Sequence, residues 1–285
     1  MYLPGSFLPD NVIPATDLAE VLADTNVVFT VVPSDYLRSV CRQMAPLARS
    51  EQIFVSATKG LENRTCLRMS EVITETFEAR FRPKLAVLSG PTFAREVARG
   101  LPTAVTIAST DGDLARQLQC QFAHSTFRFY TNTDVIGVEL GGALKNSIAI
   151  AAGVCEGLGL GSNAVAALVT RGLSEITRLA CACGARRETL TGLAGLGDLV
   201  LTCTGPLSRN RRVGVELGRG RKLAEILEST RMVAEGIHTT AAAVSLARQK
   251  GVEMRITEQM YAVLYENRSP LDAVRELMER SLKAE

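Results

Sequence analysis

The sequence contains no tryptophan, and aromatic residues make up only 5% of the chain, so it offers few side chains on which nucleic-acid bases could stack. Neither sign of charge dominates, because 32 basic and 30 acidic residues leave a net charge of +2. Nucleic acid and membrane surfaces are therefore not expected as main partners. The 46% of hydrophobic residues over 285 positions instead suits two globular domains or one large one.

Side chains that build metal sites and hydrolase triads are few and scattered. The seven cysteines lack zinc-type spacing, which predicts reduced thiols and no metal site in a cytoplasmic protein. His124 and His238 are the only histidines, and neither lies in a motif with a Ser, Cys or Asp partner. No basic segment precedes an apolar one at the N-terminus, and charged residues interrupt the apolar region 135–160, so we expect neither a signal peptide nor a membrane span.

The first half of the chain alternates short β-rich runs with longer helical patterns, which is typical of βαβ units in a largely parallel, doubly wound sheet. The expected strands are 27–32, 53–57, 85–89, 104–108 and 127–130. The expected helices between them are 35–47, 67–79, 92–99 and 112–123. The first run, VVFTVVPS, predicts a strand buried on both faces, yet no neighbouring strand is evident before it.

After Asp134 strand-like runs become rare and helical patterns follow one another. The expected helices are 135–158, 162–183, 210–218, 222–228, 238–250, 257–265 and 270–281. We therefore place a domain boundary near 130–134. An α/β domain followed by an all-helical domain predicts an enzyme whose site lies in the cleft between them.

Two candidate binding segments each follow a predicted strand. Lys59 ends the stretch SATKG, where a lysine could hold an anionic substrate or a cofactor phosphate. In SGPTFA, Thr92 could cap a helix whose free N–H groups face an anion. A surface lysine before a turn and an ordinary strand-to-helix turn are the competing interpretations.

Lys145 stands in a helix that is otherwise apolar or small. Gly141 and Gly142 each weaken that helix by about 1 kcal/mol relative to alanine, which suggests that a backbone or ligand approaches closely. Desolvation would lower the pKa of Lys145 and suit it to acid–base chemistry, unless it extends to the surface. Asp198, at the end of the GLAGLGD stretch, either pairs with Lys145 across the cleft or caps a helix.

The stretch SRNRR, residues 208–212, contains three arginines. Guanidinium groups form bidentate bonds to phosphate, so the stretch is a candidate phosphate site. A solvated basic turn is the competing interpretation.

Taken together and in order, five stretches closely resemble bacterial NAD(P)-dependent glycerol-3-phosphate dehydrogenases over essentially all 285 residues. The stretches are SATKG, LSGPTFAREVARGLPTAV, NTDVIGVELGGALKN, TGLAGLGDLVLTCTGPLSRNRR and VAEGIHT. The resemblance implies an NAD- or NADP-dependent oxidoreductase that interconverts dihydroxyacetone phosphate and sn-glycerol 3-phosphate, the precursor of phospholipids. A homodimer is compatible with it.

The resemblance also implies roles for single residues. Lys145 would be the catalytic proton donor and acceptor, Lys59 would contact substrate and cofactor, and Asp198 would support Lys145. The remaining residues are the substrate-binding set Gly90, Thr92 (usually Ser in the family), Ser208, Arg209 and Asn210, and the cofactor-binding set Pro33, Ala94, Arg209, Val233 and Glu235.

One departure from the family is large, since no GxGxxG loop occurs before residue 27. The fold class we expect is an incomplete Rossmann-type sheet, residues 1–133, followed by a helical catalytic domain, residues 134–285. Either translation starts upstream of Met1, or the chain is a truncated relative that binds NAD(P) poorly. In both cases one edge of Val27–Val32 should be unpaired or abnormally exposed.

Two alternatives to the dehydrogenase remain open at this point. A related β-hydroxyacid dehydrogenase also carries a lysine and an asparagine in the first helix of a helical domain, although the phosphate-type SRN stretch argues against it. The chain could also be an inactive relative that acts as a binding protein. The preference between NAD and NADP is not encoded in these stretches, because the residue that reads the ribose 2′ position belongs to the segment around the glycine loop.

Overall fold

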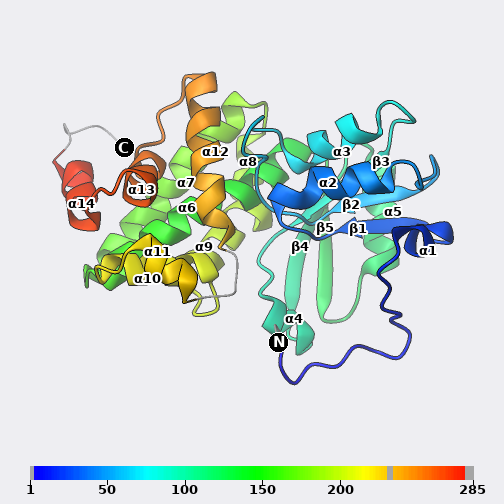
Figure 1. Ribbon diagram of the computed structural model, residues 1–285, viewed down its shortest axis with the longest axis horizontal. Coiled ribbons are helices and arrows are strands. Elements are labelled where there is room, and N and C mark those ends of the chain that lie inside the picture. Colours follow the sequence, from blue (N-terminus) through cyan, green and yellow to red (C-terminus); the bar gives the residue numbers. More distant parts are fainter. Residues whose placement is uncertain (1–2, 230–233, 280–285) are drawn as a thin grey trace.

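Five strands form one sheet beside a bundle of helices in the computed structural model, which describes residues 3–229 and 234–279 (Figure 1). The strands are β1 (Val27–Thr30), β2 (Ile53–Ser56), β3 (Lys84–Ser89), β4 (Thr103–Ala108) and β5 (Phe127–Asn132). They lie in the order β1-β2-β3-β4-β5. All neighbours are parallel except β3 and β4. The link between those two contains only the five-residue α4, which is too short to carry the chain back along the sheet.

Helices cover both faces of the sheet, as the alternating pattern predicts. One face carries α1 (Leu18–Ala23), α2 (Ser34–Met44) and α3 (Met69–Phe77), and the other carries α5 (Gly112–Phe122). The short α4 (Ala94–Ala98) buries none of its residues. Phe54 of β2 points to one side and packs with Leu37 of α2 and Phe77 of α3. Its neighbour Val55 points to the other side, where Leu118 of α5 lies in the same core. Successive side chains of a strand face opposite ways, so one apolar strand supplies two cores.

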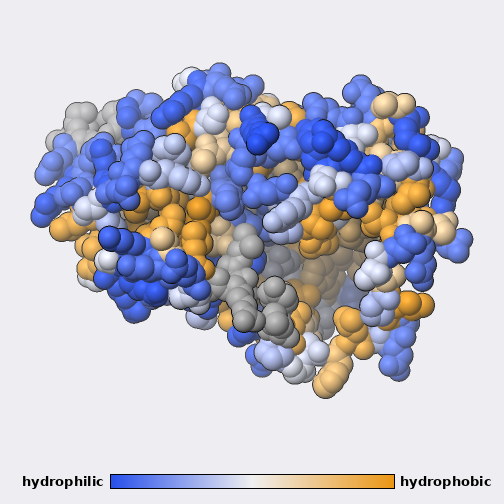
Figure 2. Space-filling view, in the orientation of Figure 1, coloured by the Kyte–Doolittle hydropathy of each residue, from blue (hydrophilic) through white to orange (hydrophobic). Residues whose placement is uncertain are grey.

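Strand β1 is shorter and more exposed than the sequence predicts. It ends at Thr30 rather than at residue 32, because Val32 donates its backbone N–H to Thr58 and Pro33 is the N-cap of α2. Phe29 is 37% exposed and Val31 is 70% exposed, so burial on both faces is wrong for this strand. Within the described residues β1 pairs only with β2, which confirms the prediction of an unpaired edge. Hydrophobic residues reach the surface over the sheet, below α2 in the view of Figure 2.

The helical part is built around α6 (Val135–Gly157), which lies at its centre (Figure 1). The elements around it are α7 (Gly161–Ala182), α8 (Arg187–Leu190), the π-helical turn η1 (Leu193–Gly197), α9 (Asp198–Thr204), α10 (Arg209–Gly218), α11 (Leu223–Glu228), α12 (Glu235–Lys250), α13 (Arg255–Tyr265) and α14 (Pro270–Met278). Helix α6 is long and apolar enough to cross a membrane, but 83% of its most apolar window is buried inside the protein. It is the core helix of this part of the molecule.

Glycines let α6 and α10 approach closely. A Cβ on Gly214 would lie 2.9 Å from the Cα of Gly153, and one on Gly218 would lie 3.0 Å from the Cα of Gly157. No side chain fits between the two backbones at these points. The crossing fixes the start of α10, which carries the SRN stretch, relative to α6, which carries Lys145.

The main error of the sequence-based assignment lies between α7 and α10. The segment 187–204 contains α8, η1 and α9, where no helix is expected. Gly192, Gly195 and Gly197 mask the helical pattern, since glycine is a weak helix former. The short α1 is missed as well, and α12 begins at Glu235 instead of residue 238.

Candidate active site

Two lysines share one buried carboxylate where the sheet meets the helical part. Lys145 of α6 donates from Nζ to Oδ1 of Asp198 at 2.6 Å. Lys59, three residues beyond β2, donates from Nζ to Oδ2 of the same group, also at 2.6 Å. Lys59 donates further to the carbonyl oxygen of Gly90, beyond the end of β3, at 3.0 Å. The expected contact between Asp198 and Lys145 is therefore present, and it extends to Lys59.

Local packing explains how these side chains meet. A Cβ on Gly141 would lie 2.6 Å from the carbonyl oxygen of Ala194 in η1, so only glycine allows this approach. Asp198 begins α9 directly after that turn. The close approach of a backbone, predicted from the two glycines, is thus confirmed at Gly141. At Gly142 the neighbour is a side chain instead, because a Cβ there would collide with the Ser89 hydroxyl.

Burial sets the protonation of this cluster. Lys145 is 5% exposed, and desolvation is the main cause that lowers its pKa to about 8, while Asp198 acts in the opposite direction. Desolvation would raise the pKa of the Asp198 carboxyl, but the positive charges of Lys59 and Lys145 outweigh it and hold that pKa below its usual value. The site therefore contains a carboxylate and a lysine that can exchange a proton near neutral pH.

Thr202 is a member of the site that the sequence analysis does not identify. Its hydroxyl receives a hydrogen bond from Lys145 Nζ at 2.5 Å and donates to the backbone carbonyl of Asp198 at 2.6 Å. Positions four apart in a helix lie on one face. The four-residue spacing between Asp198 and Thr202 is the sequence signal that could have identified Thr202. The sequence analysis expects no helix over Asp198–Thr204, so it does not place these two residues on one face.

The GPTF stretch lies at the edge of the cluster. Gly90 has φ +144°, and a Cβ there would lie 3.1 Å from the Cα of Val105, so the position requires glycine. Thr92 is not the helix cap that the sequence suggests, because α4 begins at Ala94 with Phe93 as N-cap, and the Thr92 hydroxyl donates to Gly90 at 3.2 Å. Ala94 is exposed, and α4 is too short to offer a helix dipole.

The SRN stretch begins α10. Ser208 is its N-cap and accepts from the backbone N–H of Arg211, while Arg209 is exposed. Asn210 is buried, donates from Nδ2 to Asn146 Oδ1 at 2.9 Å, and accepts from the backbone N–H of Gly236 at 3.0 Å. Asn210 therefore ties α10 to α6 and to α12, a structural role that the sequence does not reveal.

Glu235, at the start of α12, belongs electrostatically to the same cluster. Burial raises the pKa of its carboxyl, and the charges of Arg209, Lys59 and Lys145 oppose that rise. Pro33 is the N-cap of α2 and, among the described residues, forms no hydrogen bond with Lys59, Lys145 or Asp198. Val233, the remaining cofactor candidate, lies outside the described residues.

The carboxyl ends of the first three strands offer unused polar groups. Thr30, Ser56 and Ser89 are the last residues of β1, β2 and β3, and the hydroxyl of each is buried without a hydrogen-bond partner in the described part of the chain. Ligands of open α/β sheets bind at this end of the strands. Unpaired buried hydroxyls there fit a polar ligand such as a dinucleotide, with Lys59 and Glu235 beside it. Among the described residues, no cluster of three or more metal-binding side chains occurs.

A largely parallel sheet whose strand ends face a buried lysine on a helical bundle defines the class: a nicotinamide-dependent dehydrogenase with a Rossmann-type sheet. The domain family described as NAD-dependent glycerol-3-phosphate dehydrogenase N-terminus matches residues 1–115. The corresponding C-terminus family matches residues 134–275. The chain therefore belongs to the NAD-dependent glycerol-3-phosphate dehydrogenase family, whose members are oxidoreductases that act on a CH–OH group.

Individual relatives agree with that assignment. A glycerol-3-phosphate dehydrogenase (NAD(P)+) of Koribacter versatilis is 59% identical over 281 residues, covering 98% of this chain and 83% of the relative. One from Syntrophotalea carbinolica is 55% identical over 285 residues, covering 100% and 86%. The crystal structure of the Coxiella burnetii enzyme superposes with a TM-score of 0.93 at 42% identity, covering 98% of this chain and 84% of that one.

Proposed function

We propose that this chain interconverts dihydroxyacetone phosphate and sn-glycerol 3-phosphate with NAD(H) or NADP(H), and that Lys145 exchanges the proton. The observation that carries the proposal is the buried Lys145–Asp198–Lys59 cluster at the strand ends. The relatives named above bear the same activity in their names. A supply of glycerol 3-phosphate for phospholipids from a cytoplasmic enzyme belongs to the same proposal.

The chemistry follows from charge. Bound nicotinamide supplies or accepts the hydride at the carbonyl carbon. As negative charge grows on the carbonyl oxygen, Lys145 donates the proton and becomes neutral. Lys59 stabilises the developing charge with its ammonium group. Asp198 holds both lysines and returns Lys145 toward its protonated form, because the carboxylate favours the cation.

Substrate orientation is assigned to residues around that cluster. Arg209 is exposed at the start of α10 and is proposed to bind the substrate phosphate, together with Ser208 and Asn210. Binding energy from the non-reacting phosphate would hold the ketone at Lys145. Gly90 and Thr92 are proposed to line the substrate, and Pro33, Ala94, Val233 and Glu235 to line the cofactor.

The chain organisation and assembly are also proposals. We place the boundary between a cofactor domain and a catalytic domain at 133/134, which is supported by the end of β5 at Asn132 and the start of α6 at Val135. A homodimer stays a prediction of the family resemblance, to be tested by light scattering.

A substrate comparison tests the proposed activity. NADPH and NADH oxidation is followed at about 340 nm, with dihydroxyacetone phosphate and with dihydroxyacetone as separate substrates. We expect turnover only with the phosphate, and an Arg209→Gln variant should raise KM for it by about 10- to 100-fold, the loss of one charge-assisted contact. Equal turnover of both ketones would refute the phosphate site, and no oxidation with either would refute the activity.

A further inference from the structure

A loop of the sheet part belongs to the core of the helical part. Residues 60–68, here called the strap, run from Lys59 to Arg68, the N-cap of α3. Leu61 is 1% exposed and Cys66 is 5% exposed, and both lie in the same hydrophobic core as Leu140 of α6 and Ala243 of α12. The strap is therefore packed against the catalytic helix and not only against its own sheet.

Backbone hydrogen bonds close the strap into a loop, and its side chains contact both α2 of the sheet part and α12 of the helical part. Glu62 donates its backbone N–H to the carbonyl of Leu67 at 2.9 Å, and Cys66 donates to the carbonyl of Glu62 at 2.8 Å. Arg38 of α2 forms a bidentate pair with Glu62, at 2.7 and 2.9 Å. Cys66 Sγ lies 3.7 Å from the carbonyl oxygen of Ala242 in α12. Each end of the loop thus has a partner in a different part of the molecule.

A buried ion pair joins the far end of the strap to α6. Arg68 donates from Nη1 to Oε2 of Glu139 at 2.6 Å. The same carboxylate accepts from the backbone N–H of Ser70 at 2.8 Å and from its hydroxyl at 2.5 Å. The side chains of Arg68 and Glu139 are 15% and 8% exposed. Glu139 stands six positions before Lys145 on the same helix.

These contacts form a closed circuit. It runs from Glu139 of α6 through Arg68 and the strap to Lys59, and from Lys59 through Asp198 back to Lys145 of α6. We propose that the Arg68–Glu139 ion pair is a positioning device that locks the strap on α6 and thereby holds Lys59 on Asp198. The inference rests on the proposed function, because the position of Lys59 matters to the reaction through the pKa of Lys145 and through the charge that Lys59 offers to the carbonyl oxygen.

The circuit has an electrostatic consequence. Burial is the main cause of the lowered pKa of Lys145, and the ammonium of Lys59 lowers it further. If the strap loosens, Lys59 withdraws, and the pKa of Lys145 should rise. The titratable and charged groups that act on Lys145 are Asp198, Lys59, Cys203 and Glu235. At the other end, Arg68 acts on Glu139 and is itself paired with Glu71, while the neutral Ser70 donates hydrogen bonds to Glu139.

The direction in which the pKa of Lys145 changes in Glu139→Gln distinguishes displacement of Lys59 from the direct electrostatic effect of the lost carboxylate. Glu139→Gln removes a negative charge from the helix of Lys145, which by Coulomb's law alone would lower the pKa of the lysine. Displacement of the Lys59 cation moves it upward, as would entry of water at Lys145, and the double variant with Lys59→Ala separates the two. The variant keeps the size of the side chain and an acceptor for Ser70.

The experiment is a titration of the 285-residue protein labelled with ¹³C at the lysine Cε, in which Lys145→Ala assigns the Lys145 resonance. We expect the Lys145 resonance of the parent protein to titrate with a midpoint near pH 8, because burial lowers the pKa of this lysine to about 8. Glu139→Gln should raise the midpoint by about half a pH unit, the size of one partly screened charge interaction. Ser70→Ala, which keeps the ion pair, should cause a smaller rise.

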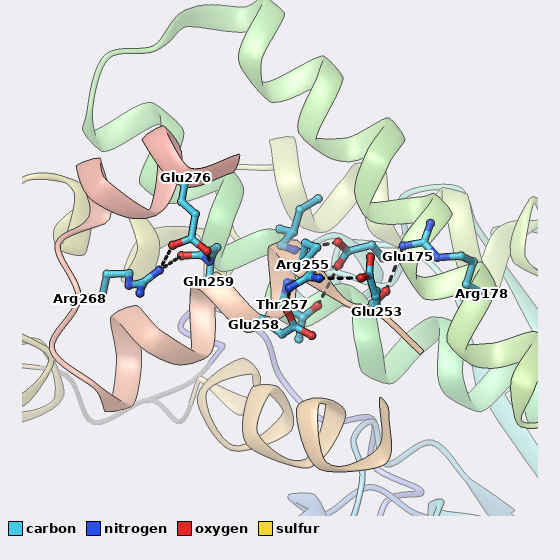
Figure 3. Close-up of polar contacts among 10 residues, drawn as sticks. Glu175, Arg178, Glu253, Arg255, Thr257, Glu258, Gln259, Arg268 and Glu276 are labelled. Atoms are coloured by element: carbon cyan, nitrogen blue, oxygen red, sulfur yellow. Dashed lines mark hydrogen bonds and ion pairs between the residues drawn. The ribbon is translucent and has the colours of Figure 1, made fainter. Parts of the chain in front are cut away.

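Two controls make the result specific. Lys59→Ala should raise the midpoint at least as far, and Glu139→Gln added to it should cause no further rise. Glu175→Gln is the matched control, because it removes a buried glutamate charge that lies outside the proposed circuit. Like Glu139, Glu175 of α7 is buried and accepts backbone N–H groups, in this case at the start of α13 (Figure 3). It should leave the Lys145 midpoint in place.

An unchanged or lowered midpoint in Glu139→Gln overturns the inference, as does an equal rise in Glu175→Gln. If Glu139→Gln does not fold, Arg68→Gln removes the other partner of the ion pair and is titrated in its place. A rise of the Lys145 midpoint that disappears when Lys59→Ala is also present supports the inference, and a rise that persists there overturns it. The titration needs no turnover, so failure of the inference is distinct from failure of the proposed function, which Lys145→Ala activity decides.

Discussion

At the scale of single residues, the account depends on two lysines that share one carboxylate. Asp198 alone cannot neutralise both, so burial and the second cation keep Lys145 near the point where it loses its proton. A proton donor works best when its pKa lies near the working pH. The Lys59 side chain is 21% exposed, whereas that of Lys145 is 7% exposed.

This arrangement predicts opposite pH dependences for the two directions. Reduction of dihydroxyacetone phosphate needs protonated Lys145, so kcat should fall as pH rises through about 8. Oxidation of glycerol 3-phosphate needs the neutral amine, so its kcat should rise over the same range. Steady-state rates from pH 6 to 10 in both directions measure this, and parallel profiles in the two directions would contradict it.

At the scale of elements, the sequence predicts the alternating sheet part well and the segment 187–204 poorly. β-Branched runs such as 53–56 and the polar caps of α5 and α6 are local signals, so they can be seen in the sequence. The η1–α9 segment depends on close packing of Gly141 against Ala194, which no local pattern encodes. The same holds for the strap, whose partner Glu139 is far away in the chain, whereas Thr202 stands four positions after Asp198, a spacing that the sequence does contain.

Lys59, Lys145 and Asp198 could be selected as candidates from their motifs, and the structure brings the three side chains together. The bonds of Asn210 to α6 and α12 could not be predicted, since an asparagine after an arginine fits a phosphate site equally well. Strand β1 shows what composition alone can miss. Its composition predicts burial on both faces, whereas the missing glycine loop of the family pattern predicts the edge position that the sheet order shows.

The cap of α13 carries a pH-dependent contribution to stability. Glu175 accepts the backbone N–H of Ile256 at 2.8 Å, and burial raises its pKa to about 7 (Figure 3). The folded chain then binds this proton more tightly than the unfolded chain, whose pKa is near 4.5. Its stabilising contribution is therefore full below pH 4.5 and is lost as pH rises through about 7.

Glu175→Gln should remove that dependence. Between pH 5 and 7.5 the parent protein should lose about 2 to 3 kcal/mol more unfolding free energy than the variant. Urea unfolding at the two pH values measures the difference. Identical changes in both proteins would show that Glu175 does not titrate in this range.

At the scale of the whole molecule, the sheet and the helical part are joined through the active site itself. Lys59 reaches Asp198, the strap enters the core around α6, and Ser89 lies against Gly142. The hydroxyls at the ends of β1, β2 and β3 are buried without a hydrogen-bond partner in the described part of the chain. A protein that only serves as a scaffold has no need of these groups.

Binding of the cofactor distinguishes the enzyme from a binding protein of another kind. Isothermal titration of the 285-residue chain with NADPH and with NADH should give saturable heat for at least one of them. Glu235→Ala, at the proposed cofactor edge, should weaken it by about 10-fold, one lost polar contact. Absence of saturable heat with both nucleotides would support the alternative of an inactive relative.

The most direct test of the central claim is the turnover of Lys145→Ala beside the parent protein, with dihydroxyacetone phosphate and reduced nicotinamide in excess. The account predicts that kcat falls by roughly 100- to 10,000-fold, the usual contribution of a general acid, while binding of the phosphate substrate largely survives. A Lys145→Ala variant that keeps a kcat near that of the parent would contradict it.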